Sequence, residues 1–518
     1  MITALAVNSA WAASGLGAWR AMHRALDRPR EAQEKVLRRV LGRSDSVTRF
    51  QRTVPIVGWD EIAPRVDAIR RGETRDLHGA RVDRLVPTSG STGGMKLIPW
   101  TALLRTQMQT ALGAWIVDVF RAQPDLMAGP AYWGVSPALD VAVEAPVPVG
   151  LEGDSAYLGR FFAPLLSRVL AVPESLRSVR DADEHRYLTA LHLLHARALR
   201  IVSVWHPSML VLLMAEIARS WDGLVDDVRR GRVRTPDPRR ADELRALGPR
   251  APLCAFFPTL GMVSAWGDAA ATRPFAELER AIAPVPIVPK GLLATEAFVT
   301  IPFAGAFPPA LCSCFVELVD DRGRTHLVDE SELHGEYEVV VTTGGGLRRY
   351  RLGDRVRVEG FVGRAPSLRF LGRTGGVDLV GEKLSEAFVA STLNDVHLPG
   401  GFAMLAPDRS GSRYVLFVDR PPRSPSDTIA RLERALGRSP YFAHARRIGQ
   451  LGPTSLFVVR GNAYARFTDT LARRGMPIGA IKPSALSPLV DWAERFDGSF
   501  VPLNSEKTCS APSSRSFS

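Results

Sequence analysis

A run of small, hydroxyl-bearing residues is the part of this sequence that points most clearly to chemistry. It is Thr-Ser-Gly-Ser-Thr-Gly-Gly-Met-Lys over residues 88–96, and it follows a short apolar stretch that ends at Pro87. Glycines let a backbone approach a phosphate closely, and hydroxyl and N–H groups can donate to the phosphate oxygens. The spacing differs from that of a Walker A loop. The segment is therefore either a phosphate-binding loop or a polar turn without a ligand.

Two carboxylates follow apolar segments further along the chain. Glu296 ends the sequence Gly-Leu-Leu-Ala-Thr-Glu, and Asp354 ends the sequence Tyr-Arg-Leu-Gly-Asp. Mg²⁺ takes one or two carboxylates together with substrate phosphates, so Glu296 is either a metal ligand or a surface residue at the end of a strand. Asp354 can accept hydrogen bonds from both hydroxyls of a ribose, or it can cap its own turn.

Lysine is rare in this sequence, which makes each lysine informative. Of the 66 basic residues only six are lysine. Lysine is a compact point charge and arginine a broad planar fork, so a lysine kept in such a chain can mark a position that arginine cannot fill. Lys482, in the sequence Gly-Ala-Ile-Lys-Pro, is then a candidate cation for a reacting phosphate. The alternative is a surface lysine beside a turn.

The overall composition excludes several classes of protein. The 518 residues are 46% hydrophobic and 23% charged, which excludes wholly disordered, collagen-like and coiled-coil chains. Four cysteines exclude a disulfide scaffold and favour a cytoplasmic location. The net charge of +12 comes from dispersed arginine, so we expect no nucleic-acid partner. No segment reaches about 18 uninterrupted apolar residues, so we expect no membrane span.

Together, these segments resemble the acyl-adenylate-forming enzyme superfamily. Within it they are similar to the bacterial form of the Gretchen Hagen (auxin-responsive) acyl-acid amido synthetase family. The family's serine/threonine/glycine motif matches residues 88–96, its tyrosine-alanine-serine-serine-glutamate motif matches residues 292–296, and its tyrosine-arginine-x-glycine-aspartate motif matches residues 350–354. Residues 54–62 and 221–232 also resemble this family. The resemblance extends over roughly residues 30–485.

The resemblance implies a role for each motif residue. Lys482 would bridge the substrate carboxylate and the α-phosphate during adenylation, and Lys96 would be the second catalytic residue. Glu296 would hold Mg²⁺. The other motif residues would bind the nucleotide, namely Thr88, Ser89, Gly90, Ser91, Thr92, Gly93, Thr295, Asp354 and Arg373. ATP and Mg²⁺ are therefore the predicted cofactors.

Two positions depart from the family pattern, and the acyl pocket has no motif of its own. Leu292 stands where the family has a tyrosine near the adenine, and Gly94-Met95 replaces the proline usual before the lysine. Candidate walls of the acyl pocket are Tyr132, Trp133, His206 and Trp266. Packing in the core is the alternative interpretation of these four residues.

The elements expected around the motifs give a mixed α/β fold. Hydrophobic spacing predicts helices over residues 101–121 and 183–230, with a β-branched insert at 201–204, and a short strand at 54–57. Residues 312–372 are expected to form strands separated by glycine-rich turns.

The expected domain organisation follows from these elements and from the resemblance. We expect a large N-terminal ATP- and acyl-binding domain with β-sheets and packed helices over residues 1–374, and a hinge at 375–376. A small mobile α+β C-terminal domain would follow over 377–503, and a disordered tail over 504–518.

The resemblance implies an ATP-dependent ligase with a biosynthetic role. Such an enzyme adenylates a carboxylic acid and releases pyrophosphate. It then transfers the acyl group to an amine such as an amino acid, forming an amide and AMP. Transfer to a thiol, of coenzyme A or a carrier protein, uses the same motifs and is the first alternative. A non-catalytic nucleotide-binding homologue is the second.

Overall fold

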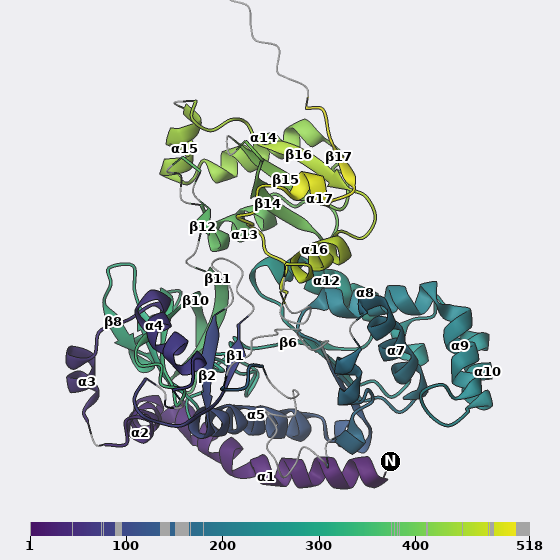
Figure 1. Cartoon of the computed structure of the whole chain (residues 1–518), viewed down its shortest axis with the longest axis horizontal. Coiled ribbons are helices and arrows are strands. Elements are labelled where there is room, and N and C mark those ends of the chain that lie inside the picture. Colours follow the sequence, from purple (N-terminus) through teal and green to yellow (C-terminus); the bar gives the residue numbers. More distant parts are fainter. Residues whose placement is uncertain are drawn as a thin grey trace, which may run out of the picture. The chain divides into compact units, whose positions relative to one another are not determined.

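The computed structural model divides the chain into two compact units. It describes residues 2–43, 45–73, 75, 77–88, 96–134, 146–150, 165, 167–179, 181–373, 376–377, 379–380, 382, 384–410, 413–447, 449–474, 476 and 481–503. The larger unit comprises Met1–Gly375, Ser385–Ala387 and Phe467–Ser484. The smaller unit comprises Gly376–Leu384, Phe388–Arg466 and Ala485–Ser518. Figure 1 shows the elements of both units in sequence colours.

An antiparallel five-stranded sheet in the larger unit has the order β11-β10-β9-β7-β8. Its strands are β7 (Phe315–Val319), β8 (Thr325–Leu327), β9 (Glu336–Thr342), β10 (Tyr350–Val362) and β11 (Ala365–Arg373). The turn between β10 and β11 has only two residues, Gly363 and Arg364, with Gly363 at φ 58°. The pairing of β10 with β9 is interrupted by a bulge between Arg351 and Arg355, where Gly353 has φ 78°. Such bulges re-aim side chains, and this one lies directly before Asp354.

A parallel four-stranded sheet, in the order β3-β4-β5-β6, forms a second layer of the larger unit. Its strands are β3 (Ala131–Trp133), β4 (Ile201–Ser203), β5 (Met262–Ala265) and β6 (Ile287–Pro289). Tyr132 and Val202 face an apolar cluster with the helices before and after β4, whereas Trp133 and Val288 face the opposite cluster. Both faces are thus covered, as is typical of parallel sheets, and ligands of such sheets bind beyond the carboxyl ends of the strands.

Helices of the larger unit cover these sheets. The helices before β3 are α1 (Ile2–Asp27), α2 (Pro29–Leu41), α3 (Val47–Thr53), α4 (Trp59–Arg70), α5 (Ala102–Ala122) and η1 (Pro124–Ala128). Those after β3 are η3 (Ser167–Val169), η4 (Glu174–Ser178), α7 (Ala182–His195), α8 (Pro207–Arg219), α9 (Trp221–Arg230), α10 (Pro238–Leu247), α11 (Leu253–Phe256), η5 (Ala269–Ala271), α12 (Thr272–Ile282) and η6 (Val328–Glu330). A hairpin of β1 (Val82–Pro87) and β2 (Leu97–Thr101) completes the larger unit.

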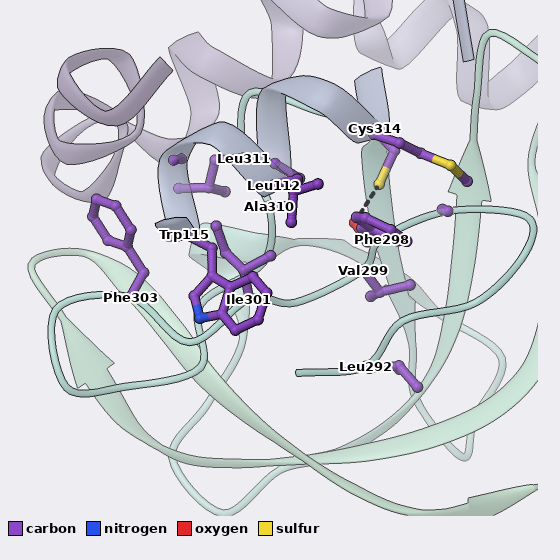
Figure 2. Packing of buried hydrophobic residues seen from close by; sticks show 14 of the residues in the cluster. Leu112, Trp115, Leu292, Phe298, Val299, Ile301, Phe303, Ala310, Leu311 and Cys314 are labelled. Carbon is purple, nitrogen blue, oxygen red and sulfur yellow. Dashed lines mark hydrogen bonds between the residues drawn. The ribbon is translucent and has the colours of Figure 1, made fainter. Parts of the chain in front are cut away.

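The helices α1 and α5 pack against one another and over one apolar cluster. A Cβ atom built on Gly15 of α1 would lie 2.8 Å from the carbonyl oxygen of Gly113 of α5, so the two backbones approach at these glycines. Figure 2 shows Leu112 and Trp115 of α5 among the apolar side chains of this cluster. The thiol of Cys314 donates to the carbonyl oxygen of Phe298 there, at 3.5 Å.

The smaller unit is built on a four-stranded sheet in the order β14-β15-β16-β17. The strands are β14 (Ala403–Pro407), β15 (Tyr414–Val418), β16 (Ser455–Val459) and β17 (Gly498–Phe500), and β15 pairs with β16 in parallel. The remaining elements of the C-terminal part of the chain are β12 (Gly376–Val377), β13 (Leu384–Ser385), α13 (Glu386–Asp395), α14 (Pro425–Leu436), α15 (Pro440–Arg447), α16 (Ala463–Ala472) and α17 (Trp492–Arg495). The predicted tail, 504–518, lies outside the described residues.

The predicted mixed α/β fold is confirmed, and one predicted strand is wrong. Helix α5 matches the helix expected over 101–121. Residues 54–57 do not form a strand. Val57 makes a single bridge to Tyr350, because Pro55 has no N–H to donate to a ladder. Within the described ranges, no helix combines the length and the apolar character needed to cross a bilayer.

Candidate active site

The hydroxyl-rich motif at 88–96 connects β1 to β2. The N–H of Thr88 donates to the carbonyl oxygen of Lys96 at 2.8 Å, so the two ends of the motif are held together. The hydroxyl of Thr88 is buried and has no hydrogen-bond partner among the described residues. The predicted nucleotide-binding residues Ser89, Gly90, Ser91, Thr92 and Gly93 lie outside the described part of the chain.

Lys96 extends from the start of β2 towards Tyr350, the first residue of β10. Its Nζ donates to the Tyr350 hydroxyl at 3.4 Å and lies 5.6 Å from the ring centre of Trp59. Burial and then the nearby Glu296 carboxylate raise the pKa of the fully buried Tyr350. The phenol therefore stays neutral.

Glu296 lies in a tight turn that the local sequence closes. Leu293 and Phe298 form an antiparallel bridge, and the N–H of Ala294 donates to the carbonyl oxygen of Ala297 at 2.9 Å. A Cβ on Gly291 would lie 2.2 Å from the carbonyl oxygen of Thr300, so the close approach of these segments requires glycine. The turn holds the Glu296 side chain in a buried position, with Thr295 half-buried beside it.

The pKa of Glu296 reflects its surroundings. Burial raises this pKa, and the positive charges of Arg373 and Lys96 act in the opposite direction. Glu296 is thus a buried carboxylate with positive charges nearby. A divalent cation bound beside it would stabilise its charged form. No group of three or more His, Cys, Asp or Glu side chains in the described part of the chain is arranged to hold a metal. Mg²⁺ does not need such a group, since it keeps several waters and is held by one or two carboxylates together with substrate phosphates.

Asp354 and Arg373 face each other across the β10–β11 hairpin. They are register partners, and the Arg373 Nε donates to the Asp354 Oδ1 at 3.2 Å. Asp354 is 2% exposed, and burial raises its pKa against the opposing charges of Arg373 and Lys482. Asp354 in turn raises the pKa of Arg373. The contact with Arg373 thus uses the Oδ1 oxygen of Asp354.

Lys482 belongs to the Phe467–Ser484 segment of the larger unit. Its Nζ lies 4.9 Å from the ring centre of Trp266. Burial, and then the charge of Arg373, lower the pKa of Lys482 to about 8, whereas Asp354 and Glu296 raise it. The predicted catalytic lysine therefore interacts with both predicted carboxylates. The structure brings three cations, Lys96, Arg373 and Lys482, around two buried acids.

Comparison with protein families matches three domains of one family to consecutive parts of this chain. The GH3 family N-terminal domain matches residues 20–287, the central domain matches residues 312–373 and the C-terminal domain matches residues 386–488. The first of these matches alone covers more than half of the chain. This protein belongs to the GH3 family.

Curated and structural relatives of this GH3 protein agree with that assignment. A probable indole-3-acetic acid-amido synthetase of Oryza sativa subsp. japonica is 25% identical, and the match covers 85% of this chain and 80% of the relative. An indole-3-acetic acid-amido synthetase of Arabidopsis thaliana is 22% identical, covering 87% and 88%. A solved structure of a GH3.15 acyl acid amido synthetase has a TM-score of 0.76 at 18% identity, covering 95% and 94%. This last likeness shows the shared fold.

Two of the four candidate pocket residues of this GH3 protein lie near Lys482. Trp266 follows β5, and Phe370 packs edge-on against it at 5.3 Å between ring centroids. His206 follows β4, is 1% exposed, and its Nδ1 accepts from the Ser208 N–H at 3.2 Å. Burial, and then the Lys482 charge, lower the pKa of His206 to about 3, so the imidazole is neutral.

The other two candidates lie on β3 and face opposite clusters. Tyr132 is buried in the cluster with α7 and α8, which favours the core interpretation for this residue. Trp133 packs against Trp115 of α5, at 6.0 Å between ring centroids. Its side chain is therefore on the α5 face of the sheet.

Sequence analysis assigned no role to three buried charged residues of this GH3 protein. Arg349 pairs with Glu317 at 3.1 Å and donates to the carbonyl oxygen of Val54 at 2.9 Å, which holds the 54–57 segment beside Tyr350. Lys290 lies directly after β6 and is 6% exposed. The rarity of lysine could have singled out Lys290, as it did Lys482. Of the residues Lys383 and Glu386, only Glu386 lies in the described part of the chain, and its carboxylate accepts from the Ser484 hydroxyl at 2.6 Å.

Proposed function

We propose that this GH3 protein is an ATP-dependent acyl acid amido synthetase. The observation that carries the proposal is the cluster of Lys96, Arg373 and Lys482 around the buried Glu296 and Asp354. Three positive charges around two acids suit a ligand that carries several phosphates and a metal ion. The relatives named as indole-3-acetic acid-amido synthetases support the same reaction class.

The first step joins the acid to AMP. An oxygen of the substrate carboxylate attacks the α-phosphorus of ATP, the bond from that phosphorus to the pyrophosphate oxygen breaks, and pyrophosphate leaves. Negative charge increases on the phosphoryl oxygens, so fixed cations around them stabilise the transition state. Lys482 would bridge the carboxylate and the α-phosphate, while Lys96 and the buried Thr88 hydroxyl would hold the leaving phosphates.

The nucleotide needs two further groups from this chain. Asp354, oriented by Arg373, would accept the ribose hydroxyls through its carboxylate. Glu296, with Thr295 beside it, would hold Mg²⁺, which supplies positive charge to the phosphates when bound. Leu292 is 6% exposed within the core cluster and would pack on the adenine only at its exposed edge.

The second step forms the amide. The nitrogen of an amine, such as that of an amino acid, attacks the carbonyl carbon of the acyl-adenylate. The bond to the phosphate oxygen breaks, AMP leaves, and the ammonium proton passes to solvent. We also propose that residues 377–503 form a mobile domain with its hinge at 375–376, since mobile lids commonly gate such chemistry. A cytoplasmic location stays a prediction.

The experiment that tests this function is ATP–pyrophosphate exchange with a panel of carboxylic acids. Indole-3-acetic acid is a rational first member, because the relatives are named for it. Exchange that depends on one class of acid supports adenylation, and mass spectrometry of products with amines and thiols then identifies the acceptor. MgATP binding without exchange for any acid would favour a non-catalytic homologue. A product formed only with coenzyme A would replace the amide with a thioester.

A further inference from the structure

A second polar cluster lies at the carboxyl ends of the parallel strands. The Nζ of Lys290, the residue after β6, donates to the Ser203 hydroxyl at the end of β4 at 2.6 Å. The same Nζ lies 5.4 Å from the ring centre of Trp115 and 5.7 Å from that of Trp205. The motif-based function assigns no role to this buried ammonium group.

Strand register places a further hydroxyl beside this ammonium. Ser203 and Ser264 are register partners on β4 and β5, and Ser264 pairs in turn with Val288 on β6. Register partners on parallel strands direct their side chains to the same face, and residues two apart on one strand do so as well. Ser203, Ser264 and Lys290 therefore lie on the face of the sheet that Trp115 of α5 covers.

This face carries two further hydrogen-bond donors, the Ser264 hydroxyl and the Trp115 indole N–H. The Ser264 hydroxyl is fully buried, and the Trp115 indole nitrogen belongs to a residue that is 5% exposed. Neither atom has a hydrogen-bond partner among the described residues. A buried donor without a partner is costly, which makes it a marker of a ligand site. Both groups belong to the face of the sheet on which the Lys290 ammonium lies.

We propose that this donor cluster, consisting of Lys290, Ser203, Ser264 and Trp115, binds a substrate carboxylate other than the one that is adenylated. The inference rests on the proposed function. A buried ammonium favours an anion over a neutral acceptor, and charge-assisted hydrogen bonds are the stronger kind. Two sources can supply such a carboxylate, namely the far end of a dicarboxylic acid or the α-carboxylate of an amino acid acceptor.

The position of the cluster fits either source. His206 and Trp266 follow β4 and β5 at the same edge of the sheet, and both interact with Lys482. Lys290 follows β6 at that edge. A substrate with its reacting carbon near Lys482 can thus direct a second, anionic group along the strand ends towards Lys290.

The test compares the full-length wild type with Lys290→Met, which keeps the length of the side chain and removes its charge. Lys35→Met is the matched control, because Lys35 is exposed on α2. In the acid arm, exchange is measured with a series of dicarboxylic acids and with their monomethyl esters. In the amine arm, amide formation is measured with amino acids and with the corresponding amino acid amides.

We expect Lys290→Met to lower kcat/KM for the carboxylate-bearing substrate by about tenfold to a hundredfold, as for loss of one charge-assisted hydrogen bond. In Lys290→Met, kcat/KM for the matching ester or amide, which lacks the carboxylate, should change little. Lys35→Met should have the wild-type kcat/KM in both arms. A loss confined to the acid arm identifies a dicarboxylic acid, and a loss confined to the amine arm identifies the amino acid. Unchanged selectivity in both arms overturns the inference.

Two further measurements keep the test independent of folding and of turnover. If Lys290→Met does not fold, Ser264→Ala removes one donor that has no partner in the described part of the chain, so it should weaken selectivity several-fold without lowering the melting temperature. Calorimetric titration of the wild type with the same compounds, without ATP, measures binding alone. Binding without exchange refutes the proposed synthetase activity only, whereas equal binding of acids and their esters, and of amino acids and their amides, overturns the carboxylate site.

Discussion

Replacing Lys482 by alanine removes the cation that interacts with both buried acids of the proposed nucleotide site, Glu296 and Asp354. We expect the rate of adenylation to fall by about 10²–10³, since one donor to a developing oxyanion contributes about 2.7–4 kcal/mol. An acyl-adenylate supplied ready-made needs no such charge stabilisation at the α-phosphate, so its reaction with the amine should be retained. Pyrophosphate exchange measures the first step, and mass spectrometry of the amide measures the second.

The pKa of Lys482 adds a signature that a structural role would not give. Burial and Arg373 lower this pKa to about 8, and the protonated form is the active one. kcat/KM for adenylation should therefore be constant below this pKa and fall about tenfold per pH unit above it. Lys482→Arg keeps its proton throughout this range and should abolish the alkaline decline, whatever its effect on the rate.

Three results would refute the role of Lys482. Equal loss of both half-reactions in Lys482→Ala, with an unchanged circular dichroism spectrum, would show that the lysine is not specific to adenylation. An alkaline decline that persists in Lys482→Arg would belong to another group. A similar loss in Lys35→Ala, which changes an exposed lysine on α2, would show that the effect is not local.

Three further predictions concern the proposed metal ligand Glu296, the helix contact and the buried histidines. Glu296→Gln should lower exchange by about a hundredfold or more and raise the Mg²⁺ concentration needed for half-maximal rate. A rate that saturates at the same Mg²⁺ concentration would contradict its assignment. Gly15→Ala should destabilise the protein by about 1–3 kcal/mol in urea unfolding, because its Cβ would lie 2.8 Å from the Gly113 oxygen. Gly17→Ala in the same helix has no atom within 4 Å and should stabilise it by about 0.5–1 kcal/mol, so equal effects would refute the packing argument. Burial lowers the pKa of His185 and of His192 to about 4, from 6.5. Their contribution to stability is therefore complete above pH 6.5 and is lost as the pH falls towards 4. Unfolding free energies measured across this range should become less dependent on pH when both histidines are replaced by glutamine.

The sequence predicted the family and the fold class, because both depend on local signals. The GH3 assignment is confirmed, and it was carried by short motifs whose order along the chain is fixed. Helix α5 was predicted from its apolar spacing alone. The roles of Glu296, Asp354 and Lys482 stay predictions, although the structure brings these residues into one electrostatic cluster.

What the sequence could not predict depends on pairing between distant segments. The contact of Asp354 with Arg373 requires the register of a hairpin, and the Ser203–Lys290 contact requires β4 and β6 to lie on either side of β5 in one parallel sheet. The segment 54–57 has the apolar residues of a strand, but its partner is a single residue of β10. Apolar periodicity predicts each helix or strand, but it does not predict which other element pairs or packs with it.

The two-residue turn at Gly363-Arg364 has a consequence for sequence change at a distance. It is a surface connection of the kind that usually tolerates insertions, yet together with two register shifts along β10 it sets the alignment of Asp354 with Arg373 at the far end of the hairpin. Its backbone is also fixed from outside, because the N–H of Arg364 donates to the carbonyl oxygen of Leu26 at 2.7 Å. One extra residue here would shift the strands by a step and turn one member of the pair to the opposite face. The contact between Asp354 and Arg373, and with it their proposed role in nucleotide recognition, can thus be lost by lengthening a loop at the other end of the hairpin.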